Sequence, residues 1–149
     1  MKHDEGFTLL ELTFALLITA LASITVGHSV LRIVDEQHLL WNRDLLLQNF
    51  RWAQVKAYEQ DAFTMVHLYP YTPVYDVANQ WKVLHRYQFS DGIGYKGGYL
   101  ALGSGRVTYG VNGVSHIGGT IRLTDKQSDE LDIILYLNSG LAEEGELHR

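Results

Sequence analysis

The chain has 149 residues, of which 46% are hydrophobic and 19% are charged, so it suits one folded domain and is not a disordered chain. Its net charge of −5 disfavours sequence-independent nucleic-acid binding, which depends on neutralising phosphates. The absence of cysteine excludes disulfides, zinc–thiolate sites and cysteine nucleophiles.

The first predicted element is a helix of membrane-spanning length at residues 7–26. This segment contains one charged residue, Glu11, and neither proline nor glycine. About 20 residues rising ~1.5 Å each cover ~30 Å, which is the thickness of a bilayer core. The threonine and serine residues are compatible with lipid because a hydroxyl can bond to a carbonyl of the preceding turn.

Two interpretations of this segment are a plain transmembrane helix and a cleaved secretory signal peptide. The sequence Ala20-Leu21-Ala22 has the pattern of a signal-peptidase site, but the residues before the apolar run are close to neutral rather than basic. Neither interpretation gives Glu11 a purpose. A carboxylate at membrane depth costs about 2.5–3.5 kcal/mol, so such a residue usually has a function and a partner.

The hexapeptide Gly6-Phe7-Thr8-Leu9-Leu10-Glu11 resembles the cleavage motif of type IV pilins and pseudopilins. The resemblance implies that residues 1–6 are a class III leader, that prepilin peptidase cuts between Gly6 and Phe7, and that Phe7 is then N-methylated. It also implies that Glu11, the fifth residue of the cut chain, pairs with the terminal amine of a neighbouring subunit during assembly. The orientation, with the head outside the cytoplasm, likewise comes from the resemblance, because the flanking charges do not favour either side.

The helix is expected to continue to about residue 60 as an amphipathic segment at 27–60. Its apolar residues recur on one face at intervals of 7, 4, 3 and 4: Leu39, Leu46, Phe50, Ala53 and Ala57. The alternative is a separate core helix that follows a turn at Gly27. Both alternatives give Leu46 and Phe50 the same packing role.

The remaining residues, 61–149, are expected to form a β-rich head with five to seven antiparallel strands. Strands are predicted at 63–69, 81–89, 106–109, 119–123 and 131–136, with a loop at 71–77 and a glycine-rich loop at 92–105. The pairs Asn112-Gly113 and Ser139-Gly140 predict turns, and the polar C-terminus is expected to be frayed. The order of one long helix followed by strands predicts an α+β, pilin-like fold.

The segment from Tyr109 to Gly140 is similar to the heads of H-type minor pilins and pseudopilins, and most similar to ComGD-type competence pseudopilins of Gram-positive bacteria. The resemblance implies a structural subunit rather than an enzyme, in a short membrane-derived pilus for DNA uptake, whose partners are other pilins of the same filament. The alternatives are a type II secretion pseudopilin, a minor pilin of a type IV pilus, a DNA-receptor subunit at the pilus tip, and a membrane-tethered enzyme.

No catalytic residue, metal site or cofactor is predicted. None of the seven histidines has a metal-ligand spacing, although His67, His85 and His116 could meet across strands. The glycine-rich loop lacks the Lys-Ser/Thr ending of a phosphate loop, so a flexible connection is the preferred interpretation.

Direct DNA contact is a second hypothesis. Basic residues interleaved with aromatic ones are typical of surfaces that follow a nucleic-acid backbone. The candidate basic residues are Lys82, Arg86, Lys96, Arg106 and Arg122, among Trp81, Tyr87, Tyr95, Tyr99 and Tyr109. The alternative is that these aromatic side chains pack in the core, and 17 acidic residues oppose an extended basic surface.

Overall fold

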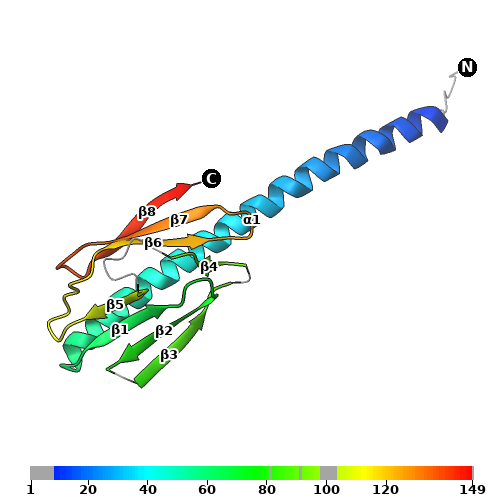
Figure 1. Cartoon of the computed structure of the whole chain (residues 1–149). Coiled ribbons are helices and arrows are strands. Elements are labelled where there is room, and N and C mark those ends of the chain that lie inside the picture. Colours follow the sequence, from blue (N-terminus) through cyan, green and yellow to red (C-terminus); the bar gives the residue numbers. More distant parts are fainter. Residues whose placement is uncertain (1–8, 81, 91, 98–103, 149) are drawn as a thin grey trace, which may run out of the picture. The chain divides into compact units, whose positions relative to one another are not determined.

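The computed structural model describes residues 9–80, 82–90, 92–97 and 104–148, except for the side chains of Thr25, Val26 and His28. One helix, α1 (Leu9–Glu59), is followed by strands that form two antiparallel sheets of four (Figure 1). Sheet A has the order β3-β2-β1-β5 and sheet B the order β4-β6-β7-β8. The strands are β1 (Thr64–Leu68), β2 (Val74–Asn79), β3 (Lys82–Gln88), β4 (Gly94–Tyr95), β5 (Arg106–Tyr109), β6 (Gly119–Thr124), β7 (Glu130–Leu135) and β8 (Ala142–His148).

Helix α1 is continuous through Gly27, so the predicted single long helix is confirmed and the alternative with a turn at Gly27 is wrong. A lone glycine costs a helix only about 1 kcal/mol relative to alanine. The helix ends at Glu59, where Gln60 N and Ala62 N donate to the carbonyls of Lys56 and Ala57, and Asp61 takes a positive φ of 48°. Such an end satisfies carbonyls of the last helical turn.

The chain divides into two compact units, Met1–Glu36 and Gln37–Arg149. None of the described side chains of the first unit is buried. The second unit, called the globular unit below, contains the end of α1, both sheets and the whole described core.

The predicted apolar stripe of α1 forms the centre of that core. Its five members are between 0% and 1% exposed: Leu39, Leu46, Phe50, Ala53 and Ala57. They belong to one cluster with inward-facing residues of both sheets, among them Val66, Tyr75, Val107, Ile121 and Ile133. The α+β, pilin-like fold with a long helix packed on antiparallel sheets is therefore confirmed.

Buried and half-buried polar side chains of α1 fix its position on the rest of the globular unit. Asn49 Nδ2 donates to Tyr75 Oη at 2.7 Å, and Gln54 Nε2 donates to the carbonyl of Gly113 at 2.8 Å. Asn42 Oδ1 accepts a bond from the backbone N of Ser90 at 3.0 Å. A buried polar group is costly when it loses its partner, so these bonds favour one register of helix against strands.

Two predictions for the strands are wrong. The loop expected at 71–77 ends at Pro73, and β2 follows between β1 and β3. Because β2 is central and four of its successive residues are buried, it lacks the alternation by which strands are recognised. The C-terminus is not frayed, since β8 pairs with β7; its polar sequence suits the edge of a sheet.

The glycine-rich segment also forms more structure than expected, because β4 lies within it and pairs with β6. With β2, β4 and β8 included, the described part of the chain has eight strands rather than five to seven. The strands expected around β1, β3, β5, β6 and β7 are confirmed.

The turn at Asn112-Gly113 is confirmed, but the strands beside it are short. Gly110 N donates to Val114 O at 2.9 Å, Gly113 has φ +72°, and a single bridge joins Tyr109 to Ser115. The turn at Ser139-Gly140 packs against it: a Cβ on Gly140 would lie 2.9 Å from Gly113 O, and its φ is +76°. Only glycine fits this approach without strain.

Candidate functional site

The predicted processing and assembly residues lie at the start of the chain. Gly6 and Phe7 lie outside the described residues, so their cleavage and methylation stay predictions. Glu11 lies in the first described turn of α1, and its side chain is exposed. An acid near a helix N-terminus interacts favourably with the helix dipole, so it stabilises this end of the helix as well.

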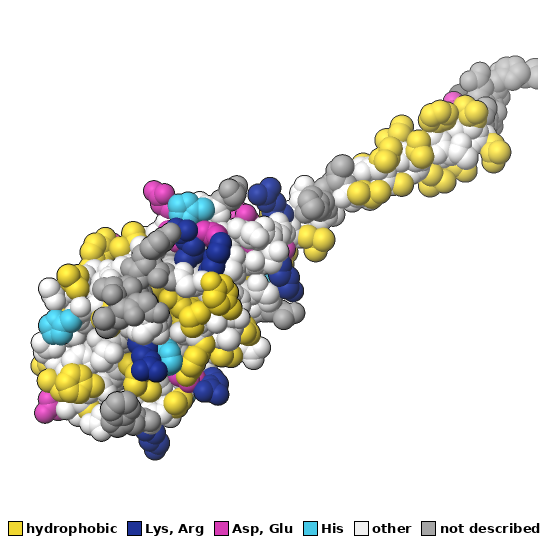
Figure 2. Space-filling model, viewed as in Figure 1, with side chains coloured by type: hydrophobic (Ala, Val, Ile, Leu, Met, Phe, Trp, Pro, Cys, Tyr) yellow, Lys and Arg dark blue, Asp and Glu magenta, His cyan; other side chains and the backbone are white. Residues whose placement is uncertain are grey.

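The surface around Glu11 is apolar. Large hydrophobic side chains from Leu9 to Ile24 are between 54% and 82% exposed, and Figure 2 shows them in yellow along the visible face of this part of α1. The segment is long and apolar enough to span a membrane. Exposed apolar surface of this extent requires lipid or other helices to cover it.

The hydroxyl groups in this segment bond to the helix itself, as expected from the sequence. Thr13 Oγ1 donates to Leu10 O at 2.8 Å, Thr19 Oγ1 to Ala15 O at 2.8 Å, and Ser23 Oγ to Thr19 O at 2.7 Å. Each bond satisfies the donor that would otherwise be costly in an apolar medium. These polar residues are therefore compatible with a lipid environment.

The five basic residues proposed for DNA contact belong to different sheets. Lys82 and Arg86 lie on β3, at one edge of sheet A, and Arg106 lies on β5, at the other edge. Lys96 follows β4 and Arg122 lies on β6, both in sheet B. The sequence spacing that interleaved them with aromatic residues therefore does not correspond to one strand or one face.

Arg86 is paired with an acid. Its Nε and Nη2 donate to both carboxylate oxygens of Asp76 at 2.7 and 2.8 Å, and Tyr69 Oη also donates to Asp76. These hydrogen bonds hold the pKa of Asp76 below its ordinary value, with burial opposing them. Asp76 is 2% exposed although it lies on the side of sheet A away from α1, because these side chains cover it.

The residues that pair with one another across sheet A continue this arrangement from Asp76 on β2 to β5. His67 is the register partner of Asp76 on one side and of Arg106 on the other. Arg106 Nε approaches His67 Nε2 at 3.4 Å, and the His67 ring packs on Tyr69 with centroids 4.1 Å apart. Burial, and then the Arg106 charge, lower the pKa of His67.

Sheet B repeats the pairing of arginine with aspartate. Arg122 Nε and Nη2 donate to Asp132 at 2.7 and 2.9 Å, and Arg122 Nη1 lies 2.9 Å from Glu130. Lys96 pairs with Glu130, and these interactions lower the pKa values of Asp132 and Glu130. Arg86, Lys96 and Arg122 are therefore neutralised by carboxylates.

Lys82 and Arg106 differ from the other three basic candidates. Both are exposed, and within the described residues neither pairs with a carboxylate. Arg106 lines a hollow of about 400 Å³ together with Phe63, Met65 and Thr108. Of the five candidates, these two have charge available for an external anion.

The aromatic candidates mostly belong to the core. Tyr95 is 2% exposed and Tyr109 is 0% exposed, and Tyr87 stacks on Tyr75 with centroids 5.2 Å apart. Trp81 and Tyr99 lie outside the described residues. The alternative of core packing is therefore confirmed for Tyr95 and Tyr109, which leaves those two rings unable to stack on bases.

The three histidines that were expected to meet across strands have separate partners. His67 contacts Arg106 and Tyr69, His85 packs edge-on against Trp52, and His116 Nδ1 bonds to Asn138 Oδ1 at 2.9 Å. In the part of the chain that the structure describes, no group of three or more histidine, aspartate or glutamate side chains could hold a metal ion.

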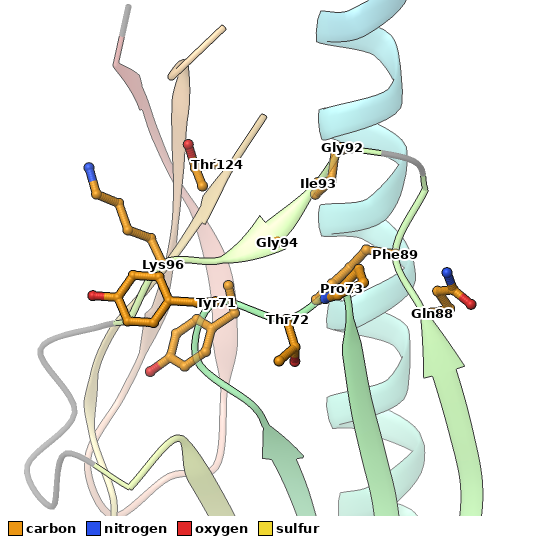
Figure 3. A pocket seen from close by; sticks show the side chains of 11 residues that line it. Tyr71, Thr72, Pro73, Gln88, Phe89, Gly92, Ile93, Gly94, Lys96 and Thr124 are labelled. Carbon is orange, nitrogen blue, oxygen red and sulfur yellow. The ribbon is translucent and has the colours of Figure 1, made fainter. Parts of the chain in front are cut away.

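A pocket of about 350 Å³ opens between the β1–β2 turn, the end of β3 and the segment around β4 (Figure 3). Tyr71 lies at its rim, is 84% exposed and has φ +59°, a conformation that costs a tyrosine about 1–3 kcal/mol. Its backbone N donates to Tyr95 O at 2.7 Å, which stabilises that conformation. The sequence did not predict this pocket, because it depends on β2 and β4.

No family model, no curated protein and no solved structure matches this chain.

Proposed function

We propose that the protein is a minor pseudopilin, a structural subunit of a short type IV-like pilus rather than an enzyme. The observation that carries the proposal is one acidic residue, Glu11, in the first described turn of α1, among large hydrophobic side chains that are exposed from Leu9 to Ile24. The Gly6-Phe7 junction before that helix supplies the processing site, and the α+β globular unit supplies the head.

The physical role of Glu11 follows from its surroundings. A carboxylate at membrane depth costs about 2.5–3.5 kcal/mol, so contact with a positive group is favoured there. Cleavage after Gly6 creates a new amino terminus, and that amine on a neighbouring subunit is the partner we propose. The pair fixes the axial register, while the apolar side chains of α1 supply the contact area between helices.

The head lies outside the cytoplasm in this proposal, and the helix waits in the membrane until it enters the filament. We propose DNA uptake as the purpose of that filament, on the resemblance of the C-terminal segment to competence pseudopilins. Type II secretion and a type IV pilus are the alternatives. Deleting the gene in its own bacterium and measuring transformation, protein secretion and surface pili in parallel distinguishes these three systems.

Substitution of Glu11 tests the assembly role. Glu11→Gln removes the charge and keeps the shape, so processing should continue while pilus assembly falls to background. Glu11→Asp keeps the charge and should retain part of the assembly. Immunoblots of membrane and sheared-pilus fractions measure both, and normal pili from the Gln variant would refute the proposed ion pair.

Substitution of Gly6 tests the processing site. Gly6→Leu should leave only the uncut precursor, because it replaces the glycine after which the proposed peptidase cuts by a bulky residue. Mass spectrometry of the purified protein reports the new terminus and the methyl group on Phe7. Mature protein of normal mass from the variant would show that the cleavage site is elsewhere.

A DNA-receptor role is the second candidate, because Lys82 and Arg106 are exposed and neither pairs with a carboxylate among the described residues. The full chain in detergent micelles should then retard double-stranded DNA in a gel at physiological salt. The double variant Lys82→Ala/Arg106→Ala should bind more weakly, and Lys56→Ala, at the end of α1, is the matched control. No retardation at tens of micromolar protein would remove this candidate.

A further inference from the structure

The two longest strands of the globular unit are both edge strands. β3 and β8 have seven residues each; β3 stands at one end of sheet A and β8 at one end of sheet B. Figure 1 shows them outermost on opposite sides of the globular unit. Within the described residues, each strand pairs with only one neighbour, so half of its backbone groups face outwards. Such an edge is a template for pairing with another strand.

The two edges carry opposite charge. β3 contains Lys82 and Arg86 and no acidic residue. β8 contains Glu143, Glu144 and Glu146 and neither lysine nor arginine. Part of this charge is satisfied within the chain, since Arg86 pairs with Asp76 and Glu144 with Arg43. Lys82 and Glu146 are exposed, and neither has an ion-pair partner among the described residues.

This charge distribution discriminates between the possible pairings of edges. Two β8 edges brought together would place acidic residues opposite acidic residues, and two β3 edges would do the same with basic residues. Like charges opposite each other in a strand pair are destabilising. Only β3 against β8 combines complementary charges with equal length.

We propose that the globular units of neighbouring copies of this chain bind each other through the β3 edge of one copy and the β8 edge of the next. The occupant of each edge is therefore a second copy, and Lys82 and Glu146 lie at the contact. The two edges are different surfaces on opposite sides of the unit, so the contact is heterologous. Each copy keeps one unused edge, and a contact of this kind propagates into an open chain rather than closing as a dimer.

The contact goes beyond the proposed function, in which the helices hold the filament together. It depends only on residues of the globular unit and not on Glu11, Gly6 or the membrane. The assembly and processing assays above can therefore fail while this contact forms, and the reverse outcome is also possible.

Site-specific cross-linking tests the contact in the full chain, because the natural sequence has no cysteine. One sample carries Lys82→Cys and another carries Glu146→Cys, both in detergent micelles, and a short bismaleimide joins cysteines that approach each other. We expect cross-linked dimer from the mixture and little from either variant alone. A chain carrying both substitutions should give a ladder of dimers, trimers and larger species.

Two controls exclude crowding in the micelle and misfolding. Gln127→Cys, on the exposed turn between β6 and β7, replaces Lys82→Cys and should not cross-link to Glu146→Cys above background. Circular dichroism should show the same spectrum for all variants, because each substituted side chain is exposed.

Charge reversal measures the electrostatic contribution to the contact between the β3 and β8 edges. With the cysteines placed instead at Gln88 and Glu143, Glu146→Lys should lower the yield of dimer by about two- to fivefold, since one exposed ion pair contributes at most about fivefold. Combining it with Lys82→Glu on the other copy should restore the yield.

If Lys82→Cys alone gave as much cross-linked dimer as its mixture with Glu146→Cys, the contact would be symmetric and the proposal would be overturned. A yield no higher than that of the Gln127→Cys control would overturn it altogether.

Discussion

Asp76 illustrates how single residues stabilise the globular unit on its solvent side. It receives two hydrogen bonds from Arg86 and one from Tyr69, and these three side chains come from β2, β3 and the segment after β1. The bonds favour the ionised carboxylate, so its pKa in the folded chain is lower than in the unfolded chain. The stabilisation is therefore complete above the unfolded value near 4 and disappears as the pH falls through the lower folded value.

Replacing Asp76 by Asn should lower the free energy of unfolding at pH 7 by about 1–3 kcal/mol, because a charged hydrogen-bonding partner of Arg86 is lost. The loss should shrink as the pH falls below about 4, where the natural carboxyl also becomes protonated. Thermal unfolding followed by circular dichroism between pH 7 and 3 measures it. Asp61→Asn is the matched control, because Asp61 is exposed and forms no ion pair with the other described residues. Equal pH profiles for Asp76→Asn and the natural chain would contradict the assignment.

The processing and assembly roles of Gly6, Phe7 and Glu11 stay predictions, which rest on the resemblance of this motif, placed before an apolar run, to the pilin cleavage site. The cluster formed by Asp76, Arg86 and Tyr69 could not be predicted from the sequence. Its members come together only through the register of β1, β2 and β3, and β2 was expected to be a loop. The same reason applies to Tyr71, whose position at a pocket depends on the distant β4.

At the scale of elements, α1 was the most predictable part of the fold. The five residues of its predicted apolar stripe keep the helical period from Leu39 to Ala57, and these five are buried as expected. The strands were less predictable, since alternation is visible only where one face of a strand meets solvent. β1 shows it clearly, with every second residue buried, whereas β2 does not.

Truncating one side chain of this apolar stripe should therefore lower the stability of the globular unit. Leu46→Ala should lower the free energy of unfolding by about 2–5 kcal/mol, through lost burial and the cavity that remains. Gln48→Ala, two residues further along the exposed side of α1, should change it by no more than about 0.5 kcal/mol. Urea unfolding of both variants provides the comparison, and similar midpoints would show that the helix does not pack as described.

For the whole molecule, the central property is that all core residues of the described chain belong to one of the two units. The buried cluster begins at Leu39 and includes residues of both sheets, while the first unit contributes none. The sequence predicted an amphipathic segment at residues 27–60, but its first buried residue among the described side chains is Leu39. The difference arises because Val30, Leu31, Ile33 and Val34 are apolar and yet exposed.

This distribution predicts that residues 37–149, expressed alone, fold into a soluble protein with native secondary structure. Its unfolding should be cooperative, because the core is complete. Circular dichroism and denaturant titration test this, with the same segment carrying Leu46→Ala as the destabilised control. A truncated chain that aggregates or lacks a cooperative transition would show that the first unit is needed for folding.

The bonds of Thr13, Thr19 and Ser23 to their own helix have a mechanical consequence for the proposed filament. A hydroxyl that already donates within its helix has no proton left to bind a neighbouring helix. Rotation or sliding of one subunit against the next would then break no bond from these three donors. Neighbouring helices could therefore slide along this surface with little resistance, and an ion pair at Glu11 would hold each subunit at one axial position.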